Sequence, residues 1–410
     1  MTAETISFPL DPGAAALLTR LHAAGHAAYA VGGCVRDSLL GQTPHDWDLC
    51  TSATPEQVLE LFGEAHCIPT GLQHGTVTVK HGGALYEITT FRTEGAYSDG
   101  RHPDHVAFVP DVKEDLARRD FTINAMAYNA EEGLIDPFGG QNDLAAGIVR
   151  AVGEPQRRFE EDALRILRLY RFAARFSFAI DPATGQAARA FCRHLDCVSE
   201  ERIAEELSRL LAAPAPGAYL EAEVLAVIFP ELDAAELPES RRILDALEPG
   251  MEHVPVRLAA LLCPLGEAGA RAALRRLKCS NALTGTVATL VREAAAGMPG
   301  AALTLTARRF LSRYDLATIT NLTALCSAQH PEQAEAFAAL QQEAARLVET
   351  NACCRINQLA VNGRDLMDAG IRPGPGLRRV LDALLEQVLT GQLPNEKAAL
   401  LAAAAQVAAS

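Results

Sequence analysis

The stretch Tyr29-Ala-Val-Gly-Gly-Cys-Val-Arg-Asp-Ser-Leu-Leu-Gly41, continued by Thr43-Pro-His-Asp-Trp-Asp-Leu-Cys50, decides how the N-terminal part of this chain folds. It predicts a short apolar strand, a Gly-Gly turn, a brief amphipathic helix and a second strand. Glycines between a strand and a helix let backbone N–H groups approach a phosphate, and the helix dipole favours the anion. We therefore expect Gly33 to bind phosphate, with Arg36 one helical turn further on and able to reach a triphosphate.

Two carboxylates, Asp46 and Asp48, open the second predicted strand beside this turn. A pair of carboxylates next to bound phosphates is the ligand set that Mg²⁺ needs for phosphoryl or nucleotidyl transfer. A third carboxylate has two candidates. Glu87 belongs to a strand that is expected to be buried or half-buried, where a charge is costly unless it is paired or metal-bound. We assign Glu87 to catalysis and its rival, Asp120, to the sugar or to local bracing.

The composition limits the class of protein. The chain has 410 residues with 49% hydrophobic and 21% charged residues, which predicts a globular protein of several domains. A net charge of -14 means that any basic binding surface must be local. The ten cysteines form no C-x-x-C pair, and the chain has no signal-peptide layout and no apolar run long enough for a membrane. We expect a cytoplasmic protein.

Two patterns divide the chain near residue 150. Before it, helix signals at 11–25 and from Pro55 alternate with strand signals at 76–80, 85–91 and 106–109. After it, strand signals almost vanish and Ala, Leu, Glu and Arg recur at helical period. The sequence therefore predicts an α+β head followed by an all-α remainder.

A second charged segment, Arg118-Arg119-Asp120-Phe-Thr-Ile-Asn124-Ala-Met-Ala127, predicts a loop that enters an apolar helix. Arg119 would bring positive charge to the triphosphate. Asn124 would hydrogen-bond the backbone or a ribose.

Asp162, Arg165, Arg168 and Arg171 recur every three residues, which predicts one slowly drifting stripe on a helix. The alternative is a solvated, salt-bridged face. Cytosine and adenine present a donor beside an acceptor, whereas uracil and guanine present an acceptor beside a ring N–H. An Asp only accepts and an Arg only donates, so one Asp–Arg pair can accept C and A and oppose U and G.

Several segments together resemble the class II tRNA nucleotidyltransferases, the CCA-adding enzymes, which are close kin of bacterial poly(A) polymerases. The tail segments Asn362-Gly-Arg-Asp365 and Gly370-Ile-Arg-Pro-Gly-Pro375 look like the shorter Gram-positive-type members. The other matching segments, in the family's order, are Gly32-Gly33-Cys-Val-Arg36-Asp37, Asp46-Trp-Asp48, Thr70-Gly71-Leu-Gln-His-Gly75-Thr-Val, Arg118-Arg119-Asp120-Phe-Thr-Ile-Asn124, Asp136-Pro-Phe-Gly-Gly140, Arg158-Phe-Glu-Glu161-Asp162-Ala-Leu-Arg165 and Glu201-Arg202-Ile-Ala-Glu205.

The resemblance implies a polymerase-beta-like nucleotidyltransferase head (1–150), a base-recognising helical neck (151–215), a helical body (216–300) and a tRNA-binding helical tail (301–410). It also implies template-independent addition of C, C and A to tRNA from CTP and ATP, by a monomer or a homodimer. Poly(A) synthesis, addition of C and C only, and non-catalytic tRNA binding stay open as alternatives. The residues implied to act are Asp46 and Asp48 on Mg²⁺; Gly33, Arg36, Arg119, Asp120 and Asn124 on phosphates or sugar; and Glu161, Asp162, Arg165, Arg168 and Arg171 around the base.

Three further expectations come with the resemblance. Tyr97–His105 matches the flexible loop linked to the switch from C to A. The segment after Glu252-His253 has the outline of a phosphohydrolase domain but no His-Asp pair, so we expect no phosphatase activity. Some arginines of three C-terminal clusters are expected to hold acceptor-stem phosphates. The clusters are Arg271, Arg275, Arg276 and Lys278; Arg308, Arg309 and Arg313; and Arg372, Arg378 and Arg379.

Overall fold

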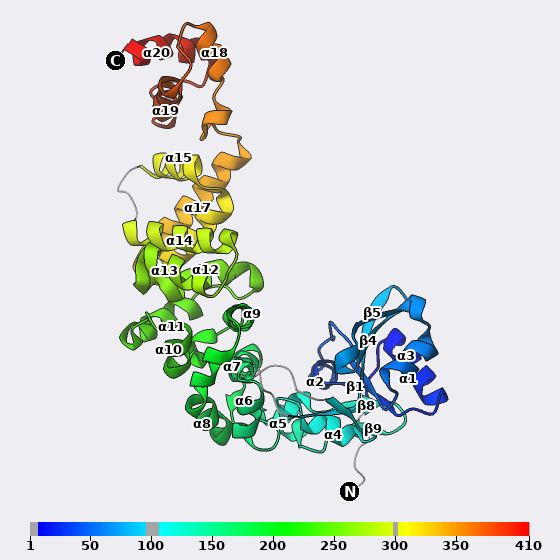
Figure 1. Cartoon of the computed structure of the whole chain (residues 1–410). Coiled ribbons are helices and arrows are strands. Elements are labelled where there is room, and N and C mark those ends of the chain that lie inside the picture. Colours follow the sequence, from blue (N-terminus) through cyan, green and yellow to red (C-terminus); the bar gives the residue numbers. More distant parts are fainter. Residues whose placement is uncertain (1–6, 96–105, 298–301, 410) are drawn as a thin grey trace. The chain divides into compact units, whose positions relative to one another are not determined.

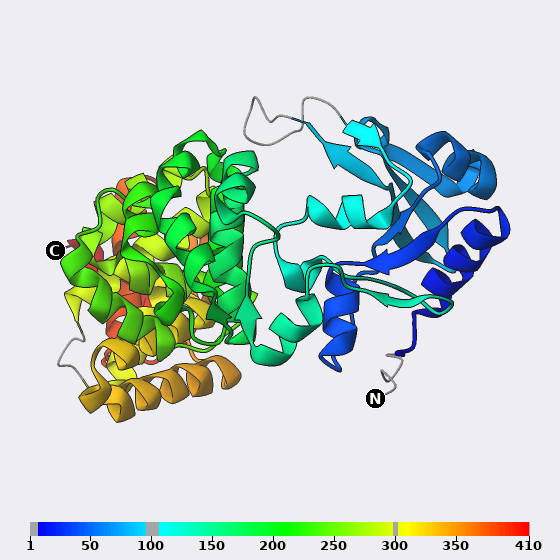
Figure 2. The same cartoon turned by 90° about the horizontal axis from the view of Figure 1, so that it is seen from below.

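The computed structural model describes residues 7–95, 106–297 and 302–409. The chain divides into two compact units, Met1–Pro230 and Glu231–Ser410. Figure 1 labels their elements in chain order, and Figure 2 shows the blue and cyan head of the first unit joined to its green neck helices. Each unit is described by itself.

The head is built on a seven-stranded sheet with the order β3-β4-β5-β2-β1-β8-β9. β2 runs parallel to β5, and the other neighbours are antiparallel. The predicted strands at 76–80 and 85–91 are confirmed, and a separate pair holds the strand predicted near 106. The strands are β1 Ala28–Val31, β2 Leu49–Thr51, β3 Cys67–Gly71, β4 Thr76–His81, β5 Ala84–Thr90, β8 Ala127–Asn129 and β9 Gly133–Ile135, with β6 Arg92–Glu94 paired to β7 Val106–Phe108.

The predicted head helices form where the sequence supplies caps. Asp11 accepts hydrogen bonds from the N–H groups of Gly13 and Ala14, both at 3.0 Å, and so begins the first helix. Thr54 caps the third helix in a capping box. The first and third helices pack on β1, β2, β4 and β5. The head helices are α1 Pro12–Ala23, α2 Gly33–Leu39, α3 Pro55–Phe62, α4 Val112–Ala117 and α5 Gly140–Ala146.

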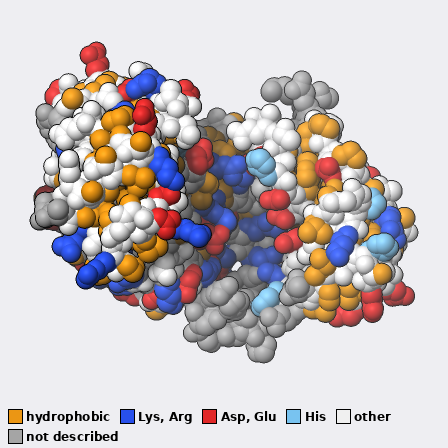
Figure 3. All heavy atoms as spheres, turned by 90° about the horizontal axis from the view of Figure 1, so that it is seen from above, with side chains coloured by type: hydrophobic (Ala, Val, Ile, Leu, Met, Phe, Trp, Pro, Cys, Tyr) orange, Lys and Arg blue, Asp and Glu red, His pale blue; other side chains and the backbone are white. Residues whose placement is uncertain are grey.

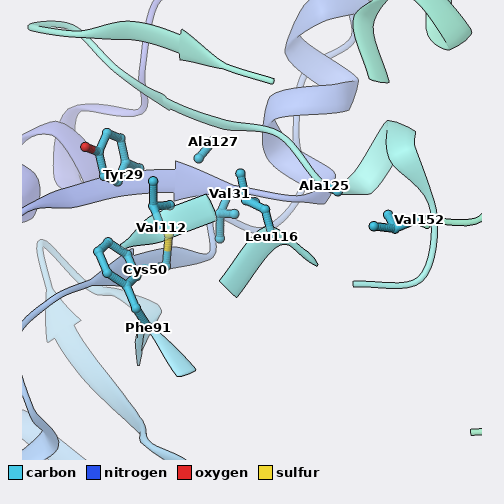
Figure 4. Packing of buried hydrophobic residues seen from close by; sticks show 9 residues of the cluster. All are labelled: Tyr29, Val31, Cys50, Phe91, Val112, Leu116, Ala125, Ala127 and Val152. Atoms are coloured by element: carbon cyan, nitrogen blue, oxygen red, sulfur yellow. The ribbon is translucent and has the colours of Figure 1, made fainter. Parts of the chain in front are cut away.

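The strand register puts an apolar core and the candidate site on one face of the sheet. Tyr29 pairs with Cys50, and the next strand over pairs Leu49 with Ile88. Because side chains alternate along a strand, Asp48 shares the face of Cys50. Figure 4 shows the core on this face, where the side chains of Tyr29, Cys50 and Leu116 pack together. Helix α4 therefore covers the Cys50 end and leaves the Asp48 end open.

The prediction of an apolar helix after Arg118 is wrong. Thr122–Asn124 forms a single 3₁₀ turn, and Ala127–Asn129 is strand β8. The apolar residues are buried by strand pairing, with Val31 opposite Ala127 in the register of β1 and β8. A short apolar run has no period that separates a buried helix from a buried strand, and here the pairing partner decides.

The rest of the first unit, which holds the predicted neck and the beginning of the predicted body, is helical apart from one two-stranded pair. Its helices are α6 Pro155–Glu161, α7 Leu164–Phe176, α8 Pro182–Ala190, α9 Glu200–Leu211 and α10 Ala222–Ile228, and the pair is β10 Ile148–Val149 with β11 Ala179–Ile180. The longest of these helices packs on α9 and carries the buried side of the neck.

The second unit is all helical in its described part. Its helices are α11 Leu237–Asp245, α12 Val254–Leu262, α13 Gly266–Arg276, α14 Asn281–Ala296, α15 Leu303–Arg313, α16 Leu316–Gln329, α17 Ala334–Glu349, α18 Gly363–Asp368, α19 Pro375–Leu389 and α20 Lys397–Ala409. Within the described ranges of both units, no helix combines the length and the apolar character needed to cross a membrane.

The core on the site face yields a stability prediction. Leu116 is fully buried, so Leu116→Ala should lower the free energy of unfolding of the head by about 2–5 kcal/mol, through lost transfer energy and the cavity left behind. Urea unfolding followed by the fluorescence of Trp47, the only tryptophan, reports on this part of the chain. Leu85→Ala, at a side chain 61% exposed, is the control. Equal unfolding midpoints for the two variants would contradict the prediction.

Candidate active site

The glycine turn forms as predicted. Gly32 has a φ of 78°, which favours glycine, and it precedes the first residue of α2. A Cβ atom at Gly32 would lie 2.9 Å from a guanidinium nitrogen of Arg119. The turn therefore needs glycine for its backbone conformation and for the close approach of Arg119.

Arg36 does not point from this turn into solvent. Its side chain is buried, donates from Nε to Asp37 at 2.8 Å and donates from Nη1 to Asn124. Its guanidinium also lies over the rings of Phe172 and Phe176, at 5.3 and 4.9 Å from the ring centroids. The prediction placed Arg36 on a triphosphate, whereas the structure places it between head and neck.

Asp48 lies at the open end of the site face. Leu49 pairs with Ile88 in parallel register, so the residues before them, Asp48 and Glu87, lie side by side. Partial desolvation by the surrounding protein raises the pKa of Asp48, and the charges of Glu87 and Asp46 raise it further, while Arg119 lowers it. The carboxylates of Asp46, Asp48 and Glu87 have no hydrogen bond or ion pair from any residue that the structure describes. Within the described ranges, this group therefore holds negative charge that no direct ion pair neutralises.

Glu87 was predicted to be a costly charge on a buried or half-buried strand, and this is wrong, because its side chain is exposed. Strand β5 alternates, with Tyr86 and Ile88 on the buried face and Glu87 on the other. What brings Glu87 next to Asp48 is the parallel register of β2 and β5, which is not visible in the sequence.

Arg119 connects the carboxylates to the glycine turn. Its charge lowers the pKa of Asp48, and its guanidinium lies beside Gly32. Its one ion pair is to Asp115, at 3.4 Å. Its Nε is buried and has no hydrogen-bond partner among the described residues. A phosphate oxygen at the glycine turn would satisfy these donors.

Asp120, the rival third carboxylate, is fully occupied by protein partners. One oxygen accepts from Asn124 at 3.0 Å and from the Phe121 N–H at 2.8 Å, and the other accepts two bonds from Arg168, at 2.9 and 2.6 Å. Burial alone would raise the pKa of Asp120, but Arg168 and Asn124 hold it well below its usual range. The geometry favours bracing over a metal or sugar contact.

The neck residues do not form one continuous helical stripe, which corrects the prediction at its first member. Helix α6 ends at Glu161, and Asp162 has an extended backbone before α7 begins at Leu164. One oxygen of Asp162 accepts from the Leu164 N–H at 3.0 Å, and the other accepts from Arg202 at 2.9 Å. A short side chain that bonds nearby N–H groups competes with helix continuation, so the chain breaks here.

The remaining predicted neck residues lie on or beside α7. Arg165 is buried and donates to Glu161 at 2.8 Å and to the carbonyl oxygen of Arg118 at 3.0 Å. Arg171 pairs with Glu206 at 2.6 Å, and burial lowers the pKa of Arg171 to about 10. Arg165 and Arg171 are therefore packed within the neck, and not on a solvated face.

Sequence reasoning missed three residues of this region. Asp115 is fully buried against Arg118 and Arg119, Arg202 holds Asp162, and Glu206 holds Arg171. Arg202 belongs to the Glu201-Arg202 segment that carries the resemblance, so the sequence did point to it. No sequence signal distinguished Asp115 and Glu206, since each lies on a helix that carries other acidic residues.

The carboxylates fit a divalent cation that also binds phosphate. Mg²⁺ in nucleotide sites usually takes one or two carboxylates and fills its shell with phosphate oxygens and water. Asp46 and Asp48 supply such oxygens, and their unneutralised charge favours a cation. Among the described residues, no three His, Cys, Asp or Glu side chains are close enough to hold an ion by themselves. Phosphate oxygens are thus part of the expected ligand set.

Most cluster arginines of the second unit already have protein partners. Figure 3, which shows one face, has Lys and Arg side chains next to Asp and Glu side chains. Within the described ranges, Arg275, Arg372 and Arg379 have no side-chain hydrogen bond or ion pair. The paired members are Arg271, Arg276, Arg308, Arg309, Arg313 and Arg378. The expected loop Tyr97–His105 lies outside the described residues.

A mixed sheet with a glycine turn and open carboxylates, followed by a helical neck, defines a nucleotidyltransferase. Residues 28–150 match the family described as poly A polymerase head domain. Residues 177–236 match a probable RNA and SrmB-binding site of polymerase A, and residues 252–404 match a putative tRNA nucleotidyltransferase domain 2.

Relatives match along almost the whole chain. A CCA-adding enzyme of Lactiplantibacillus plantarum is 38% identical over 96% of each chain, and one of Lactobacillus delbrueckii subsp. bulgaricus is 40% identical over 94% of this chain and 95% of that one. The structure of a Bacillus stearothermophilus CCA-adding enzyme in complex with CTP has a TM-score of 0.80 and 31% identity, covering 97% of this chain and 98% of that chain. The chain belongs to the CCA-adding enzymes, a family of tRNA nucleotidyltransferases.

The ion pair of the buried Asp120 with Arg168 gives a pH-dependent prediction. Asp120→Asn should lower the free energy of unfolding at pH 7 by about 1–3 kcal/mol, because Arg168 loses its closest carboxylate and keeps only the longer contact to Glu206, at 3.7 Å. Because the folded-state pKa of Asp120 is lowered, its stabilisation is present above about pH 4 and is lost as the pH falls further. Urea unfolding by Trp47 fluorescence at several pH values checks both points.

The exposed Asp196→Asn is the matched control for that measurement. A gap between wild type and Asp120→Asn that stays constant from pH 7 to pH 3 would show that the carboxylate is not the source of the stability.

Proposed function

We propose that this chain adds C, C and A in order to the 3′ end of tRNA, without a nucleic-acid template, from CTP and ATP with Mg²⁺. The observation that carries the proposal is the presence in one unit of the carboxylates of Asp46 and Asp48, which have no partner among the described residues, and of Asp162 and Arg165 at the start of the neck helix. The relatives named CCA-adding enzyme support it, as does the similar structure that contains CTP. A tRNA substrate implies the cytoplasm as its location.

In the proposed reaction the tRNA 3′-hydroxyl attacks the α-phosphate of the nucleotide, and pyrophosphate leaves. The backbone at Gly33 and the guanidinium of Arg119 bind the triphosphate, whose negative charge matches their donors. Asp46 and Asp48 hold the metal, with Glu87 adding negative charge beside them. Bound Mg²⁺ supplies Lewis-acid stabilisation of the phosphate oxygens.

Base selection is proposed to rest on Asp162 and Arg165. Arg202 and the Leu164 N–H fix both oxygens of Asp162, and each oxygen keeps a lone pair for an amine of C or A. A uracil carbonyl in this position would leave buried groups unpaired, at a cost of about 1–3 kcal/mol per group.

The other predicted nucleotide residues are proposed to act by bracing. Their polar atoms are held by hydrogen bonds and ion pairs that connect the head to the neck. Arg36 and Asn124 bridge the turn to Asp120, and Arg168 and Arg171 continue the bridge to Glu206. Glu161 orients Arg165 in the same way.

Poly(A) synthesis is the second candidate, because the head matches a family described by that activity. One experiment separates the candidates. The protein is incubated with tRNA that lacks its last three nucleotides, with CTP and ATP supplied singly and together, and the products are sequenced. C-C-A ends with both nucleotides are expected. Long A tails would support poly(A) synthesis, C-C ends alone would show CC addition, and unchanged tRNA would indicate a binding protein.

Asp48→Asn should reduce incorporation of both C and A by at least about a thousandfold, because the metal loses a charged ligand next to the reacting phosphate. The affinity for tRNA should change less than about twofold, since the phosphate contacts of tRNA lie elsewhere. Single-turnover incorporation and filter binding measure the two quantities. Turnover near that of wild type, or near that of the Asp196→Asn control, would refute the metal assignment.

Asp162→Asn should raise the ratio of UTP to CTP incorporation by about tenfold or more, because an amide both donates and accepts. Competition between the two nucleotides on one tRNA measures this ratio. Glu160→Gln is the matched control, since Glu160 is exposed and lies two residues away. An unchanged ratio together with weakened tRNA binding would instead indicate a structural role for Asp162.

A further inference from the structure

Asp115 is a fully buried carboxylate beside the candidate site, and it belongs to none of the segments that the resemblance identifies. It has 0% exposure on α4 and lies between the core residues Val112 and Leu116 in sequence. A charge in such a place is costly unless it is paired and hydrogen-bonded. The partners of Asp115 therefore show what it does.

Those partners are two consecutive arginines and one backbone group. Asp115 accepts from Arg118 at 3.0 and 2.9 Å, from Arg119 at 3.4 Å and from the Arg92 N–H at 3.3 Å. Burial would raise the pKa of Asp115, but Arg118 and Arg119 lower it below its usual value. The carboxylate is thus held ionised against both guanidinium groups.

One of these arginines faces the candidate site. Arg119 contacts Asp115 through Nη2, while its Nη1 lies near the Gly32 backbone and its Nε has no partner among the described residues. The contact to Asp115 holds Nη2 and leaves Nη1 beside the glycine turn. Arg119 also acts on Asp48, because its charge lowers the pKa of that carboxylate.

The same turn of chain also supports the base-recognising arginine. The carbonyl oxygen of Arg118 accepts from Arg165 at 3.0 Å, and that of Ala117 accepts from Arg158 at 2.9 Å. These bonds use the backbone, so they do not depend on the charge of Asp115. Loss of that charge should therefore affect the phosphate end of the nucleotide more than the base end.

We propose that Asp115 is a positioning residue for the nucleotidyl transfer: it holds the guanidinium of Arg119 towards the triphosphate and away from Asp48. This inference rests on the proposed function. Since every nucleoside triphosphate shares its phosphates, the residue acts equally on CTP and ATP and does not take part in choosing the base.

The test compares Asp115→Asn with Glu114→Gln, an exposed neighbour on the same helix that loses the same charge. KM and kcat are measured for CTP on tRNA lacking C-C-A and for ATP on tRNA ending in C-C. Asp115→Asn should raise both KM values by about tenfold, the size of one charge-assisted hydrogen bond. The ratio of UTP to CTP incorporation should stay within twofold. A purely structural role would reduce the active fraction and leave KM unchanged, which would overturn the proposal.

A double-variant cycle with Arg119→Ala tests the route of the effect. If Asp115 acts through Arg119, the double variant should have the KM values of Arg119→Ala alone, and losses that multiply would overturn the proposal. If Asp115→Asn does not fold, Asp115→Glu keeps the charge but displaces it by one methylene. A raised KM in that variant supports the proposal, and a wild-type KM overturns it. Failure of the wild-type chain to make C-C-A ends would refute the proposed function separately.

Discussion

The ion pair between Asp120 and Arg168 is the interaction on which the rest of the site depends. It joins the end of the head segment to the neck helix α7, with Asp120 buried and Arg168 partly exposed. Hydrogen bonds continue from it through Asn124 to Arg36, and from Arg36 through Asp37 to Arg175 of the neck. Because a buried charge is costly once its partner moves away, this chain of contacts resists separation of head and neck.

The satisfied and unsatisfied polar groups divide the region by role. Charges that have all their partners, such as Asp120, hold the head and neck together. Groups whose bonding capacity is unfilled lie where a substrate is expected: the carboxylates of Asp48 and Glu87, and the Nε of Arg119. Several carboxylates close together repel one another unless a cation lies between them, so their gathering beside the glycine turn is a physical argument for binding there.

The segment from Asp115 to Asp120 connects these two roles. In the proposed mechanism its side chains serve the phosphate end through Arg119; in the structure they join the neck through Asp120, and its carbonyl at Arg118 accepts from Arg165. Rigid support from one short segment keeps the distance between the phosphate and base ends of a nucleotide constant. Selection between C, A and other bases needs such constancy, because hydrogen-bond energies fall steeply with geometry.

The sequence by itself determined the local features, because they depend on neighbouring residues: the glycine turn at Gly32, the capped helices and the change to helix after residue 150. It also identified the charged residues, but not their partners. Only the tertiary structure decided that β8 is a strand, that Asp162 breaks the neck helix, that Glu87 is exposed beside Asp48 and that Arg36 is turned inward. Strand register and the pairing of distant charges settle these points, and both join residues far apart in the chain, which no local pattern records.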